Sequence, residues 1–253
     1  MRIQKRLQFA TLLGAVLSMS AHAEIAGVEF SADMVSHGPD GQTTTGKMYV
    51  GDTRMRVEMS QQGKEMVRIT DQGRGMEWIV FPAEKGYFER SVPQSAGAPS
   101  APSADTSPCE GVSGLTCQKA GQEEVAGRPA VKWEMTVTRD GQTTTGAQWI
   151  DVERGLPLKY QMPNGQAMEL KMLGSETIAG RPVEKWQMTT TAPNQQPVET
   201  FQWYDPELKL SVREEFPGGY VRELDNIQIG KQADGLFAVP SDYTKMEAPP
   251  AKN

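Results

Sequence analysis

The sequence predicts a mainly β protein: a curved antiparallel sheet, open as a half-barrel, with an internal repeat of about 53 residues and little helix. Three observations support this fold class. Apolar and polar residues alternate in twos along most of the chain, turn dipeptides separate the alternating stretches, and one block of sequence occurs twice.

The alternation is clear in RMRVEMS, where Met55, Val57 and Met59 fall on one face and Arg54 and Arg56 on the other. This period is that of half-buried antiparallel strands, with one face toward a core and one toward water. The same pattern occurs in TGKMYV, KEMVRIT, EWIVF, VKWEMTV, AMELKML and VETFQWY. Turns are expected at Asp40-Gly41, Gln62-Gly63, Gln72-Gly73, Asp140-Gly141, Asn164-Gly165 and Gly218-Gly219.

The repeat supports one continuous sheet. GQEEVAGRPAVKWEMT at 121–136 recurs as GSETIAGRPVEKWQMT at 174–189, and WIDVERGLPLKY at 149–160 recurs as WYDPELKLSVRE at 203–214. Each copy predicts a strand, a Gly-Arg-Pro turn, two tryptophan-bearing strands, a turn and a final strand. Repeated hairpins of this length build one antiparallel sheet more naturally than separate domains.

The N-terminus has the features of a secretory signal peptide. A basic start precedes the apolar run Leu7–Met19, and Ala21-His22-Ala23 predicts cleavage before Glu24. No cysteine follows the cleavage site, so a lipid anchor has no acceptor there. We therefore expect a soluble, periplasmic protein without stable membrane insertion; a retained N-terminal anchor is the alternative.

The expected organisation follows the composition. After the signal peptide (1–23) we expect an N-terminal strand set at 24–90, an Ala/Pro/Ser-rich loop at 91–108, duplicated β units at 109–247 and a disordered tail at 248–253. The loop fits either a domain linker or a segment that flanks the mouth of a curved sheet.

Charge and cysteines exclude several classes of function. The net charge is −6, and removing the signal peptide gives 23 − 32 = −9, which argues against nucleic acid or an anionic membrane as the main partner. Cys109 and Cys117 predict a structural disulfide in an oxidising compartment. Their spacing does not fit a thioredoxin-like motif, and no histidine lies nearby to complete a zinc site. No metal or cofactor is expected.

Few residues could support catalysis. After signal removal the one histidine is His37, beside a Gly-Pro turn, and no GxSxG, HExxH or P-loop motif occurs. The pair Asp151 and Glu153 recurs as Asp205 and Glu207, each time just before a turn. Turn chemistry explains such a pair better than glycoside hydrolysis does. We expect that the protein is not an enzyme.

Several segments resemble the periplasmic lipoprotein-carrier (LolA/LolB-like) superfamily. FSADMV at 30–35 is similar to its first strand, and TGKMYVGDTRMRVEM at 45–59 to the next two. RITDQGRGMEWIVFP at 68–82 resembles the following hairpin, and DGLFAVPSDYTKM at 234–246 the closing segment. The resemblance implies a β half-barrel whose concave apolar face, covered by helices, receives acyl chains. This chain departs from the pattern because it lacks the initial amphipathic helix and a visible helical lid.

The candidate ligand site is apolar. Methionine suits varied apolar ligands because it is flexible and polarizable, although an ordinary core could use the same residues. We expect the candidate lining residues to share one face of the sheet; they are Met48, Met55, Met59, Trp133, Met135, Trp149, Met168, Met172, Trp186, Met188 and Trp203. Candidates for polar contacts are Arg56, Arg128 and Arg181, for example to a lipid phosphate; a solvated surface role is the alternative.

Two functions follow from these observations. The first is a periplasmic protein that holds a lipid, an acyl chain or a lipidated polypeptide in the concave face, without a covalent step. The second is an interaction or sensor module that binds an envelope protein through a sheet edge or a repeat unit.

Overall fold

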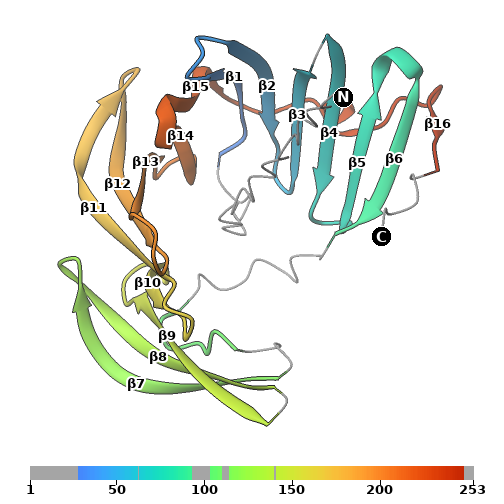
Figure 1. Cartoon of the computed structure of the whole chain (residues 1–253). Helices are drawn as coiled ribbons and strands as arrows, with labels where there is room; N and C mark the ends of the chain where they lie inside the picture. The colour runs from blue at the N-terminus through green and yellow to red at the C-terminus, as the bar shows by residue number, and fades with distance from the viewer. Residues whose placement is uncertain (1–27, 62, 93–102, 110–113, 140, 248–253) are drawn as a thin grey trace, which may run out of the picture.

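A single open sheet forms the body of the protein. The computed structural model describes residues 28–61, 63–92, 103–109, 114–139 and 141–247. They form a sixteen-stranded sheet in the order β16-β6-β5-β4-β3-β2-β1-β15-β14-β13-β12-β11-β10-β9-β8-β7. Neighbouring strands are antiparallel apart from the parallel pair β16–β6. The sheet bends into an arc with β6 and β16 near one end and β7 at the other (Figure 1).

The strands are β1 (Phe30–His37), β2 (Thr43–Val50), β3 (Arg54–Gln61), β4 (Lys64–Asp71), β5 (Met76–Phe81), β6 (Gly86–Ser91), β7 (Leu115–Val125), β8 (Arg128–Arg139), β9 (Gln142–Asp151), β10 (Pro157–Gln161), β11 (Ala167–Ile178), β12 (Arg181–Thr191), β13 (Val198–Asp205), β14 (Leu210–Phe216), β15 (Tyr220–Ile229) and β16 (Thr244–Lys245). Among the described residues the helices are three short 3₁₀ turns: η1 (Pro82–Glu84), η2 (Pro217–Gly219) and η3 (Asp234–Phe237). The predicted mainly β, open antiparallel fold with little helix is confirmed. The predicted signal peptide and C-terminal tail lie outside the described residues.

The two halves of the sheet join through strands that are far apart in the sequence. β1 to β6 form by successive hairpins toward one edge, the chain then continues as β7 at the opposite edge, and β7 to β15 lead back to the middle. There β15 pairs with β1, for example through Phe30 opposite Ile229 and Met34 opposite Leu224. The sheet is therefore continuous from edge to edge.

The strands β7–β10 and β11–β14 make matching local structures. Gly121 and Gly174 each lie at a register shift in the long hairpins β7–β8 and β11–β12. The hairpin turns at Ala126-Gly127 and Ala179-Gly180 have positive φ at both residues: 49° and 81° in the first, 48° and 79° in the second. Two consecutive left-handed residues define the type I′ turn, which matches the right-handed twist of the flanking strands.

The C-terminal segment covers one face of the N-terminal strands. Phe237 of η3 is 1% exposed and packs against Val67, Ile69 and Val80 of β4 and β5. Beyond η3 the chain reaches the sheet edge, where β16 pairs with β6. This segment seals the face that also carries Tyr49 and Trp78.

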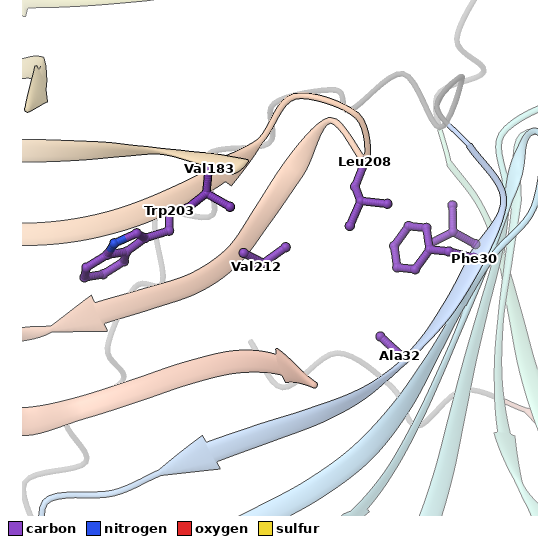
Figure 2. Close-up of a cluster of buried hydrophobic side chains, with 7 residues drawn as sticks. Phe30, Ala32, Val183, Trp203, Leu208 and Val212 are labelled. Atoms are coloured by element: carbon purple, nitrogen blue, oxygen red, sulfur yellow. The ribbon is translucent and has the colours of Figure 1, made fainter. Parts of the chain in front are cut away.

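A second cluster lies where the arc bends between its halves. Leu208 and Val212 of the β13–β14 hairpin pack with Phe30 and Ala32 of β1 (Figure 2). Phe30 is fully buried, and Leu208 is 4% exposed. The bend is thus stabilised by apolar contacts between the β13–β14 hairpin and β1.

The disulfide holds a strap on the sheet. Cys109 and Cys117 are bonded, as predicted. Residues 103–109, which we call the strap, place buried Ala104 against Val131, Trp133 and Ile150 of β8 and β9. The described part of the Ala/Pro/Ser-rich loop therefore packs on the sheet; residues 93–102 lie outside the described part.

Candidate functional site

Five methionines share one face of the N-terminal strands. In antiparallel strands, directly opposite residues point to the same side and successive residues alternate. Met34 lies opposite Gly46, Gly46 opposite Met59, and Met59 opposite Met66. Met48 and Met55 lie on the same side of the sheet, in neighbouring rows. The cross-strand partner of Met48 is Val57, and that of Met55 is Val50. We call the side of the sheet defined by Met34, Met48, Met55, Met59 and Met66 the methionine face.

The methionine face continues into the second half of the sheet. Ser36, in phase with Met34, pairs with Arg222 of β15. Successive cross-strand pairs then lead through Glu214 and Gln202 to Trp186 on β12. The same side continues through Met168, Tyr160 and Gln148 to Trp133 on β8. Nine of the predicted lining residues therefore lie on the methionine face: Met48, Met55, Met59, Trp133, Met135, Met168, Met172, Trp186 and Met188.

Trp149 and Trp203 lie on the opposite face, so the expectation that all four tryptophans share one side is wrong. Trp149 pairs with Lys132 and Trp203 with Lys185, whereas Trp133 and Trp186, the next residues along those strands, point the other way. Register places the two tryptophans of each unit back to back across the sheet.

Trp149 and Trp203 are held by matching polar contacts. The Trp149 indole N–H donates to Glu123 at 2.9 Å, and that of Trp203 donates to Glu176 at 2.6 Å. The Lys132 ammonium lies 5.2 Å from the Trp149 ring centroid and the Lys185 ammonium 4.6 Å from that of Trp203. The tryptophan hydrogen bond also lowers the pKa of Glu123 and that of Glu176, against desolvation.

Burial divides the predicted lining residues into two groups. Core positions, 7% exposed or less, are Trp133, Trp149, Met168, Trp186 and Trp203. Half-buried positions, which solvent reaches in part, are Met48, Met55, Met59, Met135, Met172 and Met188. The first group packs within the protein's own clusters, and contact of either group with a ligand stays a prediction.

The two faces of β2 to β5 differ in how they are covered. Phe237 seals one face at β4 and β5, whereas Met59 and Met66 lie half-buried on the other, in one row with Met34 of β1. None of these three belongs to the four buried clusters of described residues. The half-buried Phe81 and Phe88, with ring centroids 5.7 Å apart, extend the row to β5 and β6.

Gly46 lies within this row and contributes no side chain to it. A Cβ at position 46 would collide with the Glu58 carbonyl oxygen on β3, so close approach of the strands requires glycine there. Neither Met34 nor Met66 was predicted as a lining residue. Met34 shares its phase in FSADMV with Phe30 and Ala32, which could have identified it, whereas Met66 alternates with the apolar Val67 and Ile69 and reaches this face only through its pairing with Met59.

A charged cluster lies on the same face. Glu77 of β5 is 1% exposed, and both of its oxygens accept hydrogen bonds from arginine: 2.6 Å from Arg68 Nε on β4 and 2.6 Å from Arg90 Nε on β6. The sequence interpretation did not include these residues. The available signal was their position: all three occupy the same phase as apolar neighbours such as Met66 and Ile79.

The three predicted polar residues lie on the face opposite the methionines. Arg56 donates to Glu58 at 2.7 Å and to the Leu236 carbonyl at 2.9 Å, which ties β3 to η3. Arg128 and Arg181 occupy equivalent places in the two units. They are therefore separate from the methionine row, and their contact with a ligand stays a prediction.

Arg128 and Arg181 close matching turns. Arg128 bonds buried Asp151 and, at 2.8 Å, Glu153. Arg181 bonds Asp205 at 2.5 Å and Glu207 at 2.8 Å. The carboxylates of Asp151 and Asp205 each accept two backbone N–H groups as well. These contacts agree with the turn chemistry expected from the sequence.

Comparison with known proteins finds similarity in structure alone. No protein-family model matches the chain, and no curated protein matches its sequence. A LolA superfamily protein from Nitrosomonas europaea has 13% identity and a TM-score of 0.35, with 85% of this chain and 95% of that one covered. A putative outer membrane lipoprotein-sorting protein domain from Vibrio parahaemolyticus has 12% identity and a TM-score of 0.33, with 84% and 89% covered. LolA superfamily structures are thus among those similar to this chain.

A search of the described residues for membrane-spanning helices found none with the required length and apolarity.

Proposed function

We propose that this chain is a non-catalytic binding protein of the bacterial envelope that holds a lipid or acyl chain on its methionine face. One observation supports this function above the others. The row Met34, Met59 and Met66 is half-buried and outside the buried clusters, although the reverse side of the neighbouring β4 and β5 is sealed by Phe237.

The dimensions of the row suit one acyl chain. From β1 to β4 it crosses three strand spacings of about 4.8 Å, or roughly 14 Å, and one leaflet of a bilayer core is about 15 Å thick. Binding would remove apolar surface from water at about 25 cal/mol per Å². Methionine side chains can adapt to a mobile chain because they are unbranched and flexible.

We also propose that the protein has no catalytic role, because its candidate catalytic groups contact other residues of the protein. His37, expected in a loop, is the last residue of β1 and contacts Thr43 at 3.1 Å and Glu223 at 3.4 Å. The carboxylates of Asp151 and Asp205 accept hydrogen bonds from backbone N–H groups in their turns. The Cys109–Cys117 disulfide supports an oxidising compartment such as the periplasm.

Displacement of a neutral fluorescent probe, N-phenyl-1-naphthylamine, by dodecanol tests the function. We expect wild-type protein to bind the probe, dodecanol to displace it, and Met59→Gln to weaken binding about tenfold because a polar group replaces an apolar contact. Met162→Gln is the matched control, since Met162 is 44% exposed in the turn after β10. No probe binding, or equal effects of the two substitutions, would refute the function.

A sheet edge favours protein binding as a second candidate. β7 is the last strand at one end of the sheet, eleven residues long and exposed at most positions. An extended peptide could add to its free backbone groups. Capture of one envelope protein that is lost on Gln118→Pro, with the methionine variants unaffected, would support this function.

A further inference from the structure

Glu77 is a buried carboxylate between two arginines that are themselves open to solvent. The side chain of Arg68 is 49% exposed and that of Arg90 is 63% exposed, while Glu77 is 1% exposed. Each arginine uses Nε and Nη2 on Glu77. The third guanidinium nitrogen of each has no hydrogen-bond partner among the described residues.

The cluster carries a net positive charge beside the methionine row. Two guanidinium groups face one carboxylate, so one positive charge remains, on a chain whose overall net charge is −6. Arg68 lies two residues from Met66 on β4, on the same face, or roughly 7 Å along the strand. Its direct cross-strand neighbours are Val57 and Ile79, both apolar.

We propose that Arg68 and Arg90 bind the oxyanion of an acyl ligand whose hydrocarbon chain lies along the methionine row, an inference that rests on the proposed function. The ligand class is an anionic amphiphile with one chain in this row and a carboxylate or phosphate headgroup. Charge complementarity supports this occupant because guanidinium donors suit planar or tetrahedral oxyanions. Glu77 is a positioning residue that orients both guanidiniums.

The competing interpretation is structural. An Arg-Glu-Arg ladder across β4, β5 and β6 stabilises the sheet through cross-strand pairs without any ligand. Both interpretations predict a loss of stability when one arginine is removed, since a buried carboxylate would lose a partner. They differ in whether the ladder distinguishes charged from neutral ligands.

Displacement of N-phenyl-1-naphthylamine by dodecanoate and by dodecanol at pH 7.5 separates the two. The triple variant Arg68→Gln/Glu77→Gln/Arg90→Gln removes the charges together and leaves no unpaired ion. In this variant we expect the affinity for dodecanoate to fall about tenfold relative to the affinity for dodecanol, as for a lost charge-assisted hydrogen bond. Glu77→Gln alone should raise the affinity for dodecanoate relative to that for dodecanol, because both guanidiniums keep a partner while one negative charge is lost.

Arg74→Gln is the matched control. Arg74 is 60% exposed and paired with Asp71 between β4 and β5, but its guanidinium lies over Trp78 on the opposite face. The Arg74→Gln substitution should leave the ratio of the affinities for dodecanoate and dodecanol unchanged. Inorganic phosphate and acetate test for a site that needs no chain; we expect neither to displace the probe at millimolar concentration.

The outcomes distinguish the inference from the function on which it rests. If dodecanol and dodecanoate both bind, and their ratio is the same in wild type, Glu77→Gln and the triple variant, the headgroup site is wrong and the acyl site stands. If neither displaces the probe, both proposals fail. Should the triple variant not fold, the Glu77→Gln ratio decides alone, and no change there refutes the site.

Discussion

The indole N–H of Trp133 donates a 2.9 Å hydrogen bond to the backbone carbonyl of Ala104. Trp133 belongs to β8 and is 7% exposed, and Ala104 belongs to the strap. The disulfide at the end of the strap and the Lys119–Asp105 ion pair hold the same segment. The strap, a segment of the same polypeptide, thus covers the part of the methionine face around Trp133.

Opening the disulfide should loosen this cover. Cys109→Ser/Cys117→Ser is expected to lower the free energy of unfolding by about 2–3 kcal/mol, because the closed loop holds about nine residues. Acrylamide should quench Trp133 fluorescence more strongly in this variant, measured with the other four tryptophans replaced by phenylalanine. Unchanged quenching would show that the strap stays in place without its covalent bond.

Asp151 should make stability depend on pH. Burial raises its pKa, but hydrogen bonds from the Arg128 guanidinium and the backbone N–H groups of Arg154 and Glu153 outweigh burial and hold the pKa below 3.8. A lowered folded-state pKa contributes stability above the unfolded value of about 4, and this contribution is lost as the pH falls through the folded value. Urea denaturation at pH 7 and pH 3 should therefore show a smaller pH effect in Asp151→Asn than in wild type.

The same substitution should be costly at neutral pH. Breaking the buried pair with Arg128 is expected to lower the free energy of unfolding by about 3 kcal/mol at pH 7. Asp52→Asn serves as the control, because Asp52 is exposed in the turn before β3. If the two variants behave alike at both pH values, the turn contact does not stabilise the protein.

Phe237 should be essential for the cover on the face opposite the methionines. Phe237→Ala removes a side chain that is 1% exposed and that also lies under the Arg54 guanidinium at 4.7 Å. Large-to-small changes of this kind cost about 3–5 kcal/mol. Tyr220→Ala, at a 38% exposed position, should cost less than about 1 kcal/mol by guanidinium denaturation. A similar cost for both would contradict the packing of η3.

Methionine oxidation should follow burial. Peroxide is expected to convert the half-buried Met34, Met59 and Met66 to sulfoxides faster than Met168, which is 5% exposed. Peptide mass spectrometry over time measures each rate, and saturating dodecanol should slow the first group alone. Equal rates with and without dodecanol would place the ligand elsewhere.

Much of the fold could be predicted from local patterns. Alternation of apolar and polar residues with a period of two identified the strands. The Gly-Arg-Pro turns and the DG and NG dipeptides located hairpins. The sites that were missed depended on long-range contacts instead. Arg68, Glu77 and Arg90 come from three strands, and no motif in the sequence links them. Met34 could have been placed by its phase within β1, but the row that it shares with Met66 arises only when β1 to β4 pair.

Which side chains within a strand point to the same side follows from the amino-acid order alone, since alternation is a property of the extended backbone. The sequence also determined the cysteine pair and the low helix content. How the phase of one strand relates to that of the next depends on strand pairing, because a shift of one residue in register turns every side chain to the other face. This is why Trp133 and Trp149 separate, and why the face sealed by Phe237 could not be known from the sequence.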